Sequence, residues 1–531
     1  METIKTDVLV IGGGGAGMRA ALAAKEEGAK VLLVSKTPLG KSTCTYFSGG
    51  GIAMATEGMS RETHLERTLK AGKGINRREL VDILIQEVPE RVEELERLGL
   101  TGKRRPGSFY TVGGRPPGWG GPLADFLADL NRKQGISFMP WTMVSELILE
   151  EGKAAGALGF DYRKGVPLAF NARSILLANG GGAALYGRND NPVRTTGDGY
   201  ALAYEAGCRL LDMEFVQFFP TGLAEPGKPT YFLRAHLSDV GAVVNSKGEE
   251  IYAKYGITDR PAAMRSRDAF SLALFREKRE GREVFLDLRS VSRDAWFQKL
   301  NEQDYHIYME NFSAREKPIR IAPMCHFTMG GVVTDLAGKT DVPGLYAAGE
   351  VCGGMHGANR MGGNALGEIL VFGARAGKAA GQWARERSGG KSGEVAIQSR
   401  MAGYEKNVGI TAAGLPPRSL RKEIGEILWE KAGILRDKRG LSQALESLES
   451  LKAERFPKMR SATPKEVLEK IEVEKAFVTG EMIIRSALLR EESRGAHFRE
   501  DFPQTDDQKW KGNILLHKTS SGMNLEFQPL R

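Results

Sequence analysis

Hydrophobic and polar positions near the start of the chain predict a strand, a helix and a second strand. Residues 8–11 are a short apolar run, which is typical of a buried parallel strand. Residues 18–27 are rich in alanine and predict a helix that Gly28 ends, and residues 31–34 form the second apolar run. The turn between the first strand and the helix carries Gly12, Gly14 and Gly17 in the spacing G-x-G-x-x-G.

This order of elements predicts a dinucleotide-binding βαβ unit. The glycines allow a tight turn, close approach of a pyrophosphate and packing of helix on strand, and the helix N-terminus faces the negative charge. The second strand ends at Val34-Ser35-Lys36, without the acidic residue that often binds the ribose hydroxyls there. The motif therefore leaves NAD and FAD both open, with Ser35 as a candidate ribose contact.

The pattern further along the chain predicts an α/β fold with a discontinuous dinucleotide-binding domain. Residues 174–178 and 345–349 are further apolar strands that run into glycine, whereas residues 225–322 alternate short strands with charged helices. Residues 416–490 have helical periodicity. We predict a two-part Rossmann-like domain over residues 1–225 and 330–400, an inserted α+β capping domain over 226–329, and a C-terminal helical domain with a tail over 410–531.

Proline and glycine make two local predictions. Pro89 falls inside a helical pattern and predicts a kink or a break. Residues 103–122 are rich in glycine, proline and arginine and predict one long loop.

Composition narrows the class of protein. The chain has 531 residues, which favours two or more domains. It has no long apolar run and no apparent secretion signal, so we expect no membrane span. Its four cysteines (Cys44, Cys208, Cys325 and Cys352) form no CxxC pair, so we expect no metal centre in this chain and a reducing, cytoplasmic location, with any membrane association through a partner.

The net charge of the chain adds little to the prediction of its function. The formal net charge of +9 is moderate for this length; it fits an ordinary solvated surface better than steering of an acidic substrate or partner. No motif supports binding of nucleic acid.

Four later segments carry a family resemblance. They read EFVQFFPTG at residues 214–222, CHFTMGG at 325–331, HGANR at 356–360 and SRGAH at 493–497. In this order they resemble the flavoprotein subunits of succinate dehydrogenase and fumarate reductase, and their relative L-aspartate oxidase. The resemblance runs from the first strand to about Asp507. It implies FAD rather than NAD, and the same arrangement of FAD-binding, capping and helical domains.

The resemblance also implies which residues bind FAD. The pyrophosphate would be held by Gly12, Gly14, Gly15, Ala16 and Gly17, and the adenosine ribose by Ser35 and Lys36. The flavin would lie along Ser42, Thr43, Gly50 and Gly51, and the adenine and ribityl side would be closed by Val144, Ala178, Gly180 and Asp198. The ribityl chain and the ring would be held from the other half of the domain by Glu350, Asn364, Ala365 and Leu366. From the residues alone, Asp198 fits equally well as a helix cap.

One departure bears on how FAD is attached. Succinate dehydrogenases attach FAD through a histidine in the segment that aligns with residues 41–46, where this chain has Ser42, Thr43 and Cys44. The resemblance therefore implies noncovalent FAD, as in L-aspartate oxidase. A thioether through Cys44 is the alternative to a small buried thiol.

Three residues match the family's reacting groups. Arg360 matches the arginine that clamps a substrate carboxylate, a task that suits a planar bidentate donor. His326 matches the histidine that bonds the same end of the substrate, and Arg267 the arginine proposed to move the proton. The alternatives are a core histidine at 326 and a surface ion pair between Arg267 and Asp268.

The expected substrate pocket departs from the family. The histidine of HPTG is Phe219 here, the Thr-Glu pair of the dicarboxylate enzymes aligns with Leu233 and Arg234, and the relay arginine with Leu237. Loss of hydrogen-bonding partners changes specificity strongly. We therefore expect a small organic acid or thioester with one carboxylate or carbonyl at the Arg360 end and an apolar or extended remainder. Arg234 would supply a replacement charge or face solvent.

These observations predict an FAD-dependent oxidoreductase that transfers a hydride at a C–C bond next to a carboxyl or carbonyl group. An iron–sulfur partner would carry the electrons, as in the family's respiratory members. The alternatives are L-aspartate oxidase and a non-catalytic FAD subunit that passes electrons within a larger redox complex.

Overall fold

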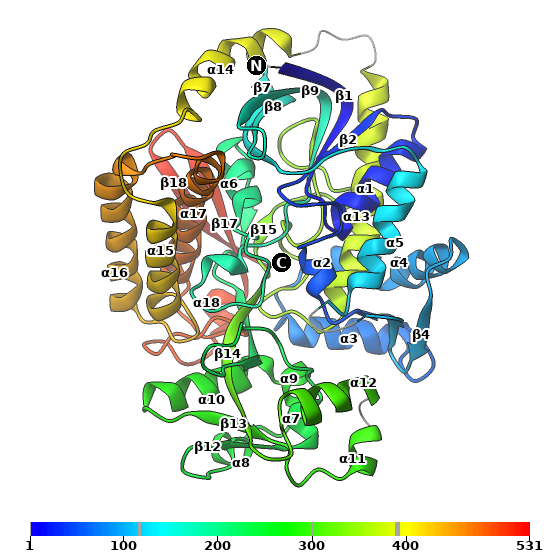
Figure 1. The fold of residues 1–531 in the computed structure, drawn as a ribbon, viewed down its shortest axis with the longest axis vertical. Coiled ribbons are helices and arrows are strands. Elements are labelled where there is room, and N and C mark those ends of the chain that lie inside the picture. The colour runs from blue at the N-terminus through cyan, green and yellow to red at the C-terminus, as the bar shows by residue number, and fades with distance from the viewer. Residues whose placement is uncertain (1, 115–117, 299–301, 388–392, 531) are drawn as a thin grey trace.

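The main body of the protein is built on a largely parallel sheet. The computed structural model describes residues 2–114, 118–298, 302–387 and 393–530 (Figure 1). The strand order is β6-β2-β1-β9-β8-β7, and β16 also pairs with β9. The bounds are β1 Glu2–Ile11, β2 Val31–Val34, β6 Ser137–Met139, β7 Thr142–Glu150, β8 Lys153–Asp161, β9 Val166–Leu177 and β16 Leu345–Ala347. The sheet thus includes a strand from each side of residues 225–322.

Helices from both ends of this discontinuous body pack on one another. Helices α1 (Gly15–Glu26), α5 (Gly121–Lys133) and α13 (Asn364–Glu386) lie side by side (Figure 1). A Cβ at Gly377 of α13 would lie 2.1 Å from the carbonyl oxygen of Ala20 in α1. The close approach of the two backbones requires glycine there, and it fixes the late helix on the first βαβ unit.

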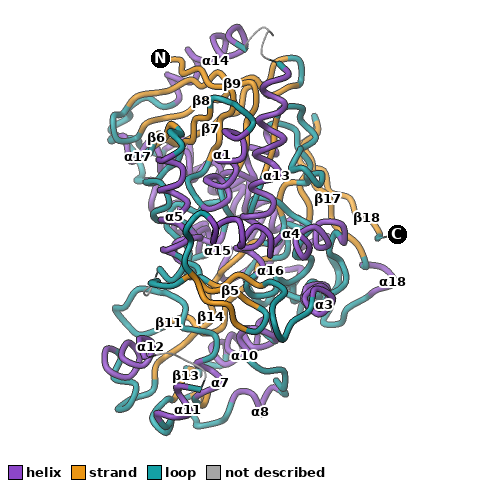
Figure 2. Tube along the Cα trace, turned by 90° about the vertical axis from the view of Figure 1, so that its right-hand side faces the viewer, coloured by secondary structure: helices purple, strands orange, loops and turns teal. Residues whose placement is uncertain are grey.

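The inserted part forms a separate lobe at the foot of the molecule in Figures 1 and 2. Its sheet has the order β11-β14-β13-β12, with bounds β11 Val216–Leu223, β12 Ala242–Asn245, β13 Val284–Asp287 and β14 Ile319–Thr328. Its helices are α7 Leu237–Val240, α8 Ile251–Tyr255, α9 Ala262–Arg265, α10 Arg267–Arg279, α11 Arg293–Phe297, α12 Glu302–Tyr305 and the π-helical segment His306–Asn311. We call this lobe the cap. Its sheet begins at β11, ahead of the predicted boundary at 226.

The C-terminal part is a helical bundle with a β-hairpin. The bundle comprises α15 Pro417–Lys431, α16 Lys438–Ser450 and α17 Pro464–Leu489. Strands β17 (Gly512–Thr519) and β18 (Gly522–Pro529) form the hairpin, which joins β10 (Leu210–Leu211) and β15 (Gly331–Val332) in one sheet. The remaining helices are α2 Cys44–Phe47, α3 Arg61–Ala71, α4 Arg78–Arg97, α6 Asp198–Glu205, α14 Glu394–Asn407 and α18 Asp507–Trp510, with shorter helical turns at Ala183–Leu185, Leu451–Arg455 and Phe456–Lys458.

The two local predictions from proline and glycine need correction. Pro89 lies inside the continuous helix α4, so the predicted break is wrong. Side chains before and after it, including Leu84 and Val92, are buried. The predicted loop at residues 103–122 begins as a hairpin. Strands β4 (Gly102–Arg105) and β5 (Ser108–Thr111) pair with each other, and β5 pairs with β3 (Gly51–Ala53), since Pro106 and the positive φ of Gly107 suit a tight two-residue turn.

No helix in the described part of the chain is long and apolar enough to cross a membrane.

Candidate active site

A groove opens where the glycine loop meets the main sheet. The predicted FAD-binding residues that line it are Gly12, Gly14, Gly15, Ala16, Ser35, Lys36, Ser42, Thr43, Val144, Ala178, Gly180, Asp198 and Glu350. They come from the carboxyl ends of β1, β2 and β9, from the segment before α2, from β7, from α6 and from the segment after β16. This is the edge at which dinucleotides bind in open parallel sheets.

The shape of the groove fits a pyrophosphate. A Cβ at Gly12, whose φ is +125°, would lie 2.1 Å from the carbonyl oxygen of Ala178, and one at Gly17 would lie 1.9 Å from the carbonyl oxygen of Gly12. Gly17 therefore packs helix on strand and does not line the groove. Helix α1 begins at Gly15, just after Gly14, so its N-terminus presents backbone N–H groups to the groove.

Charged side chains close the far end of the groove. Lys36 donates to Asp198 (Nζ–Oδ1 2.8 Å) and to Glu472 of α17 (3.2 Å). Burial raises the pKa of Asp198, but the Lys36 ammonium and the hydrogen bonds to Asp198 outweigh it and leave the pKa below its usual value. Gly197 precedes α6, and the Asp198 side chain does not cap that helix. The helix-cap interpretation of Asp198 is therefore wrong.

A larger cavity of about 860 Å³ continues from the groove to the cap. Cys44, Thr45, Glu350 and Ile369 line both spaces, so the two form one connected site. Three of the residues predicted to contact FAD, Gly51, Ala365 and Leu366, line the cavity. So do Phe219, Arg234, Arg267, His326 and Arg360. Burial raises the pKa of the Glu350 carboxyl to about 8.

Besides Gly17, three predicted site residues lie elsewhere. The Leu233 side chain is fully buried in the apolar core of the cap, and the neighbouring Phe232 lines the cavity in its place. Asn364 turns away from the cavity: its side chain bonds His64 (2.8 Å) and donates to Thr68 (3.0 Å). Gly50 lies against the backbone of Trp119, whose carbonyl oxygen would be 2.6 Å from a Cβ there.

Two buried guanidinium groups of the cavity wall converge on one amide oxygen. Gln217 Oε1 accepts from Arg267 Nη1 at 2.6 Å and from Arg360 Nη2 at 3.1 Å. Gln217 lies on β11, Arg267 begins α10 of the cap, and Arg360 follows β16 in the main body. Gln217 Nε2 also donates to Asn359 Oδ1 at 2.6 Å, which ties the cap to the main body at this point.

The electrostatics of this pair favour an anion. Burial and the neighbouring Arg360 lower the pKa of Arg267 to about 9, and burial also lowers the pKa of Arg360. Both groups remain cations at neutral pH. Arg360 Nε is buried without a hydrogen-bond partner in the described part of the protein, and an unpaired buried charged donor is costly. Asp268 pairs with Lys73 (3.6 Å), so the surface ion-pair interpretation of Arg267 is wrong.

His326 reaches the cavity because of a β-bulge. In the pairing of β11 with β14, Gln217 faces Phe327 and Phe218 faces Cys325, so His326 is the extra residue. A bulge re-aims the side chain of the extra residue. His326 Nδ1 bonds Asp190 Oδ2 at 2.7 Å. Burial lowers the pKa of His326, and Arg360 and Arg267 lower it further, against the opposing effect of Asp190.

The other side of His326 is apolar. The Phe219 ring lies 5.2 Å from the imidazole and 5.7 Å from the Phe232 ring, measured between centroids. Arg234 lines the cavity, but its guanidinium lies 3.9 Å over the Trp119 ring and pairs with Asp304 at 3.1 Å. Arg234 is therefore held against the protein surface by these two contacts, and its charge is paired with Asp304.

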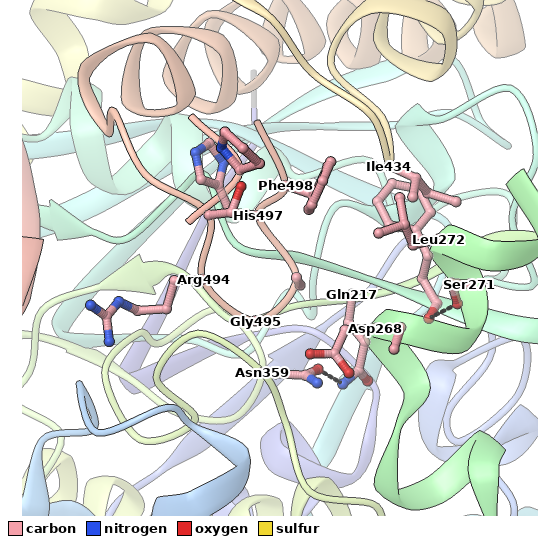
Figure 3. Close-up of a pocket in the computed structure, with 15 residues that line it drawn as sticks. Gln217, Asp268, Ser271, Leu272, Asn359, Ile434, Arg494, Gly495, His497 and Phe498 are labelled. Carbon is pink, nitrogen blue, oxygen red and sulfur yellow. Dashed lines mark hydrogen bonds between the residues drawn. The ribbon is translucent and has the colours of Figure 1, made fainter. Parts of the chain in front are cut away.

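The sequence analysis missed Gln217 and Asp190. Gln217 stands inside the EFVQFFPTG segment, and Asp190 follows the glycine-rich segment after β9, but neither spacing revealed which way the side chain points. Figure 3 shows Gln217 bonded to Asn359 at a second cavity, which both residues line together with Asp268 and the SRGAH segment. In that segment Arg494 donates to Glu492, and His497 bonds Arg436. The motif therefore contributes packing around the second cavity, and its charged side chains are paired within the C-terminal part.

This arrangement can hold a carboxylate or carbonyl group, move a proton at an imidazole and enclose a dinucleotide beside both. The described residues contain no group of three or more His, Cys, Asp or Glu side chains suited to a metal. Fold and site together define an FAD-dependent oxidoreductase of the two-part Rossmann-like class.

Comparison with known proteins gives the family. Residues 7–366 match the FAD binding domain family, and residues 421–531 match the family described as fumarate reductase flavoprotein C-term. The chain belongs to the fumarate reductase and succinate dehydrogenase flavoprotein family, and it uses FAD.

Similar proteins cover the chain almost end to end. A fumarate reductase (CoM/CoB) subunit from Methanothermobacter marburgensis is 34% identical over 97% of this chain and 98% of its own. An L-aspartate oxidase from Streptomyces coelicolor is 31% identical over 97% of this chain and 91% of its own. A solved Escherichia coli quinol fumarate reductase is 29% identical, with a TM-score of 0.89 over 100% of this chain and 97% of the other.

The first prediction concerns FAD attachment. Cys44 is half-buried, and its Sγ lies 3.1 Å from Asn191 Oδ1. Desolvation, with the nearby Glu350, raises the pKa of the thiol and disfavours the reactive thiolate. We therefore expect acid precipitation of the holoprotein to leave the flavin in the supernatant, and Cys44→Ala to retain FAD at the wild-type stoichiometry. Flavin absorbance in the washed precipitate of the wild type, lost in Cys44→Ala, would establish the thioether instead.

Proposed function

We propose that this protein interconverts a C=C and a C–C bond next to a carboxylate, in a small acid with one anionic end and an apolar remainder. The observation that carries the proposal is the convergence of Arg267 and Arg360 on one oxygen of Gln217, beside a groove that fits FAD. FAD, when bound, supplies or accepts the hydride. The protein's part is to clamp the acid, orient it and move the proton.

In this proposal Arg360 and Arg267 bind the carboxylate. Guanidinium groups match a carboxylate bidentately, and an anion placed here would partner Arg360 Nε. His326 faces the same space. The rings of Phe219 and Phe232 beside His326 suit an alkyl group or the apolar part of a thioester better than a second carboxylate.

We propose that the predicted FAD-binding residues lining the groove and cavity hold FAD noncovalently, with Glu350 at the junction of the two spaces. Lys36 acts mainly by keeping Asp198 ionised at the end of the groove. Three of the predicted residues act through packing. A Cβ at Gly17 or Gly50 would meet neighbouring backbone, and the Asn364 side chain bonds His64.

We propose further that an iron–sulfur protein exchanges electrons with the flavin. Several similar proteins are named as subunits, among them the one that belongs to the Methanothermobacter fumarate reductase. The described residues contain no cluster site of their own.

Anaerobic flavin reoxidation tests the substrate class. We expect dithionite-reduced holoprotein to be reoxidised faster by crotonate or a crotonyl thioester than by fumarate. Arg360→Leu should slow the reaction about 100- to 1,000-fold, because it removes a buried charge aimed at the reacting acid. The matched control is Arg439→Leu, an exposed arginine on α16, which should react as the wild type does.

Other outcomes of that experiment would overturn the proposal. Steady consumption of L-aspartate with release of peroxide would make the protein an L-aspartate oxidase. A flavin that no acid or thioester reoxidises, and that exchanges electrons with a copurifying protein alone, would make it a non-catalytic electron-transfer subunit.

The aromatic end of the pocket gives a second prediction. Phe219→His places a hydrogen-bond donor where the family carries HPTG, so we expect the ratio of fumarate to crotonate reoxidation rates to rise about 10-fold or more, the size of a modest hydrogen-bond gain. Phe232→Leu keeps the wall apolar and should leave the ratio near its wild-type value. An unchanged ratio in Phe219→His would show that this wall does not select the substrate.

A further inference from the structure

We propose that the C-terminal bundle completes the adenosine end of the FAD site. Glu472 of α17 is the positioning residue: it pairs with Lys36 and Arg194 at the groove, and so makes the site select an adenosine whose ribose carries no phosphate. The proposal concerns the cofactor alone, so its test is independent of the substrate proposed above.

The end of β2 marks the adenosine end of the groove. In a dinucleotide-binding βαβ unit the glycine loop holds the pyrophosphate, and the end of the second strand meets the adenosine ribose. Here β2 ends at Val34, and Ser35 and Lys36 follow it. The groove adjoins the active-site cavity elsewhere, at Cys44 and Glu350, so the ribose end and the reacting end of the site are separate.

Two cations line the adenosine end of the groove. An acidic residue after the second strand binds the ribose hydroxyls in many such units, whereas an arginine nearby accommodates a phosphate on the ribose. Lys36 and Arg194 both line the groove. By themselves these two cations would therefore predict a site for a phosphorylated ribose.

Carboxylates from two other elements pair with these cations. Lys36 Nζ donates to Asp198 Oδ1 of α6 at 2.8 Å and to Glu472 Oε1 of α17 at 3.2 Å. Arg194 Nη1 donates to Glu472 Oε2 at 2.6 Å. Each oxygen of Glu472 thus binds one of the two cations, although Glu472 follows Lys36 by 436 residues in the sequence. Helix α17 therefore supplies an acid that the end of β2 lacks.

The bundle fixes the position of Glu472. The Glu472 side chain is 0% exposed, and Arg421 of α15 also donates to its Oε2, at 3.5 Å. About two turns further along α17, the Thr479 hydroxyl donates to the Gly197 carbonyl at 3.0 Å. Helix α17 therefore lies against the loop that precedes α6, and this loop lines the groove.

The paired cations favour an uncharged ribose for a physical reason. A dinucleotide bound here removes this end of the groove from water, and burying an unpaired cation is costly. With Glu472 and Asp198 in place, Lys36 and Arg194 are covered as ion pairs. A phosphate on the ribose would have to compete with these carboxylates for the same cations, and their like charges would repel it.

Two adenine nucleotides that differ in one group test this selectivity. Adenosine 2′,5′-bisphosphate carries the ribose phosphate that AMP lacks, and both are measured as competitors of FAD for the ligand-free full chain. We expect the wild type to bind AMP about 10-fold more tightly than the bisphosphate or better, because the added phosphate meets paired cations. A wild type that prefers the bisphosphate overturns the proposal, and this measurement needs no variant.

Glu472→Gln tests the role of the bundle. The substitution keeps the shape of the side chain and removes its charge, so Lys36 and Arg194 lose the anion that they share. We expect the ratio of the AMP dissociation constant to the bisphosphate dissociation constant to rise about 10-fold or more, the size of a charge-assisted hydrogen bond. The affinity for FMN, which contains no adenosine, should stay at its wild-type value.

Two further variants separate this role from a general loss of packing. Lys36→Met added to Glu472→Gln removes one of the freed cations, so it should return the ratio toward its wild-type value. Glu481→Gln is the matched control, since Glu481 lies on the same helix and pairs with Arg485 at 2.6 Å; it should leave the ratio unchanged. An unchanged ratio in Glu472→Gln, or an equal rise in Glu481→Gln, overturns the proposal.

Discussion

The structure of this site depends on one shared hydrogen-bond acceptor, the side-chain oxygen of Gln217. It accepts from Arg267 of the cap and from Arg360 of the main body, so two cations are buried where their charges repel. Asp190 and Glu350 offset part of that charge, and an anion between the guanidinium groups would offset more. The same glutamine joins cap and main body through Asn359. The group that holds the two arginines together therefore also holds the cap on the main body, and we expect an anion bound between the arginines to stabilise this contact.

The FAD-binding half is governed by a different constraint, because its backbone must come close to a pyrophosphate. Gly12 and Gly17 allow strand, helix and neighbouring strand to come within contact, and α13 packs equally closely on α1 at Gly377. Because α13 follows the inserted cap in sequence and begins just after Arg360, this packing also brings Arg360 to the cavity that adjoins the groove. The cap can therefore contribute Arg267 and His326 to the cavity that adjoins the groove at the glycine loop.

Much of this could be predicted from sequence. Apolar runs located β1, β2, β9 and β16, three of them followed by glycine, and the motifs brought Arg267, His326 and Arg360 into one site. Side-chain direction could not be predicted. Register shifts between β11 and β14 turn His326 toward the cavity, while Leu233 turns into the core and Phe232 takes its place. The direction of the Asn364 side chain is set by its contact with His64, and the position of Asp190 by its contact with β14. The spacing of residues in the sequence does not reveal either contact.

The central claim is that buried guanidinium groups select a carboxylate. Flavin absorbance changes can report the dissociation constants of crotonate and of its uncharged isostere crotonamide for the oxidised holoprotein. We expect crotonamide to bind about 100-fold more weakly or worse, since it cannot neutralise Arg267 and Arg360. Equal dissociation constants for the two ligands would contradict it.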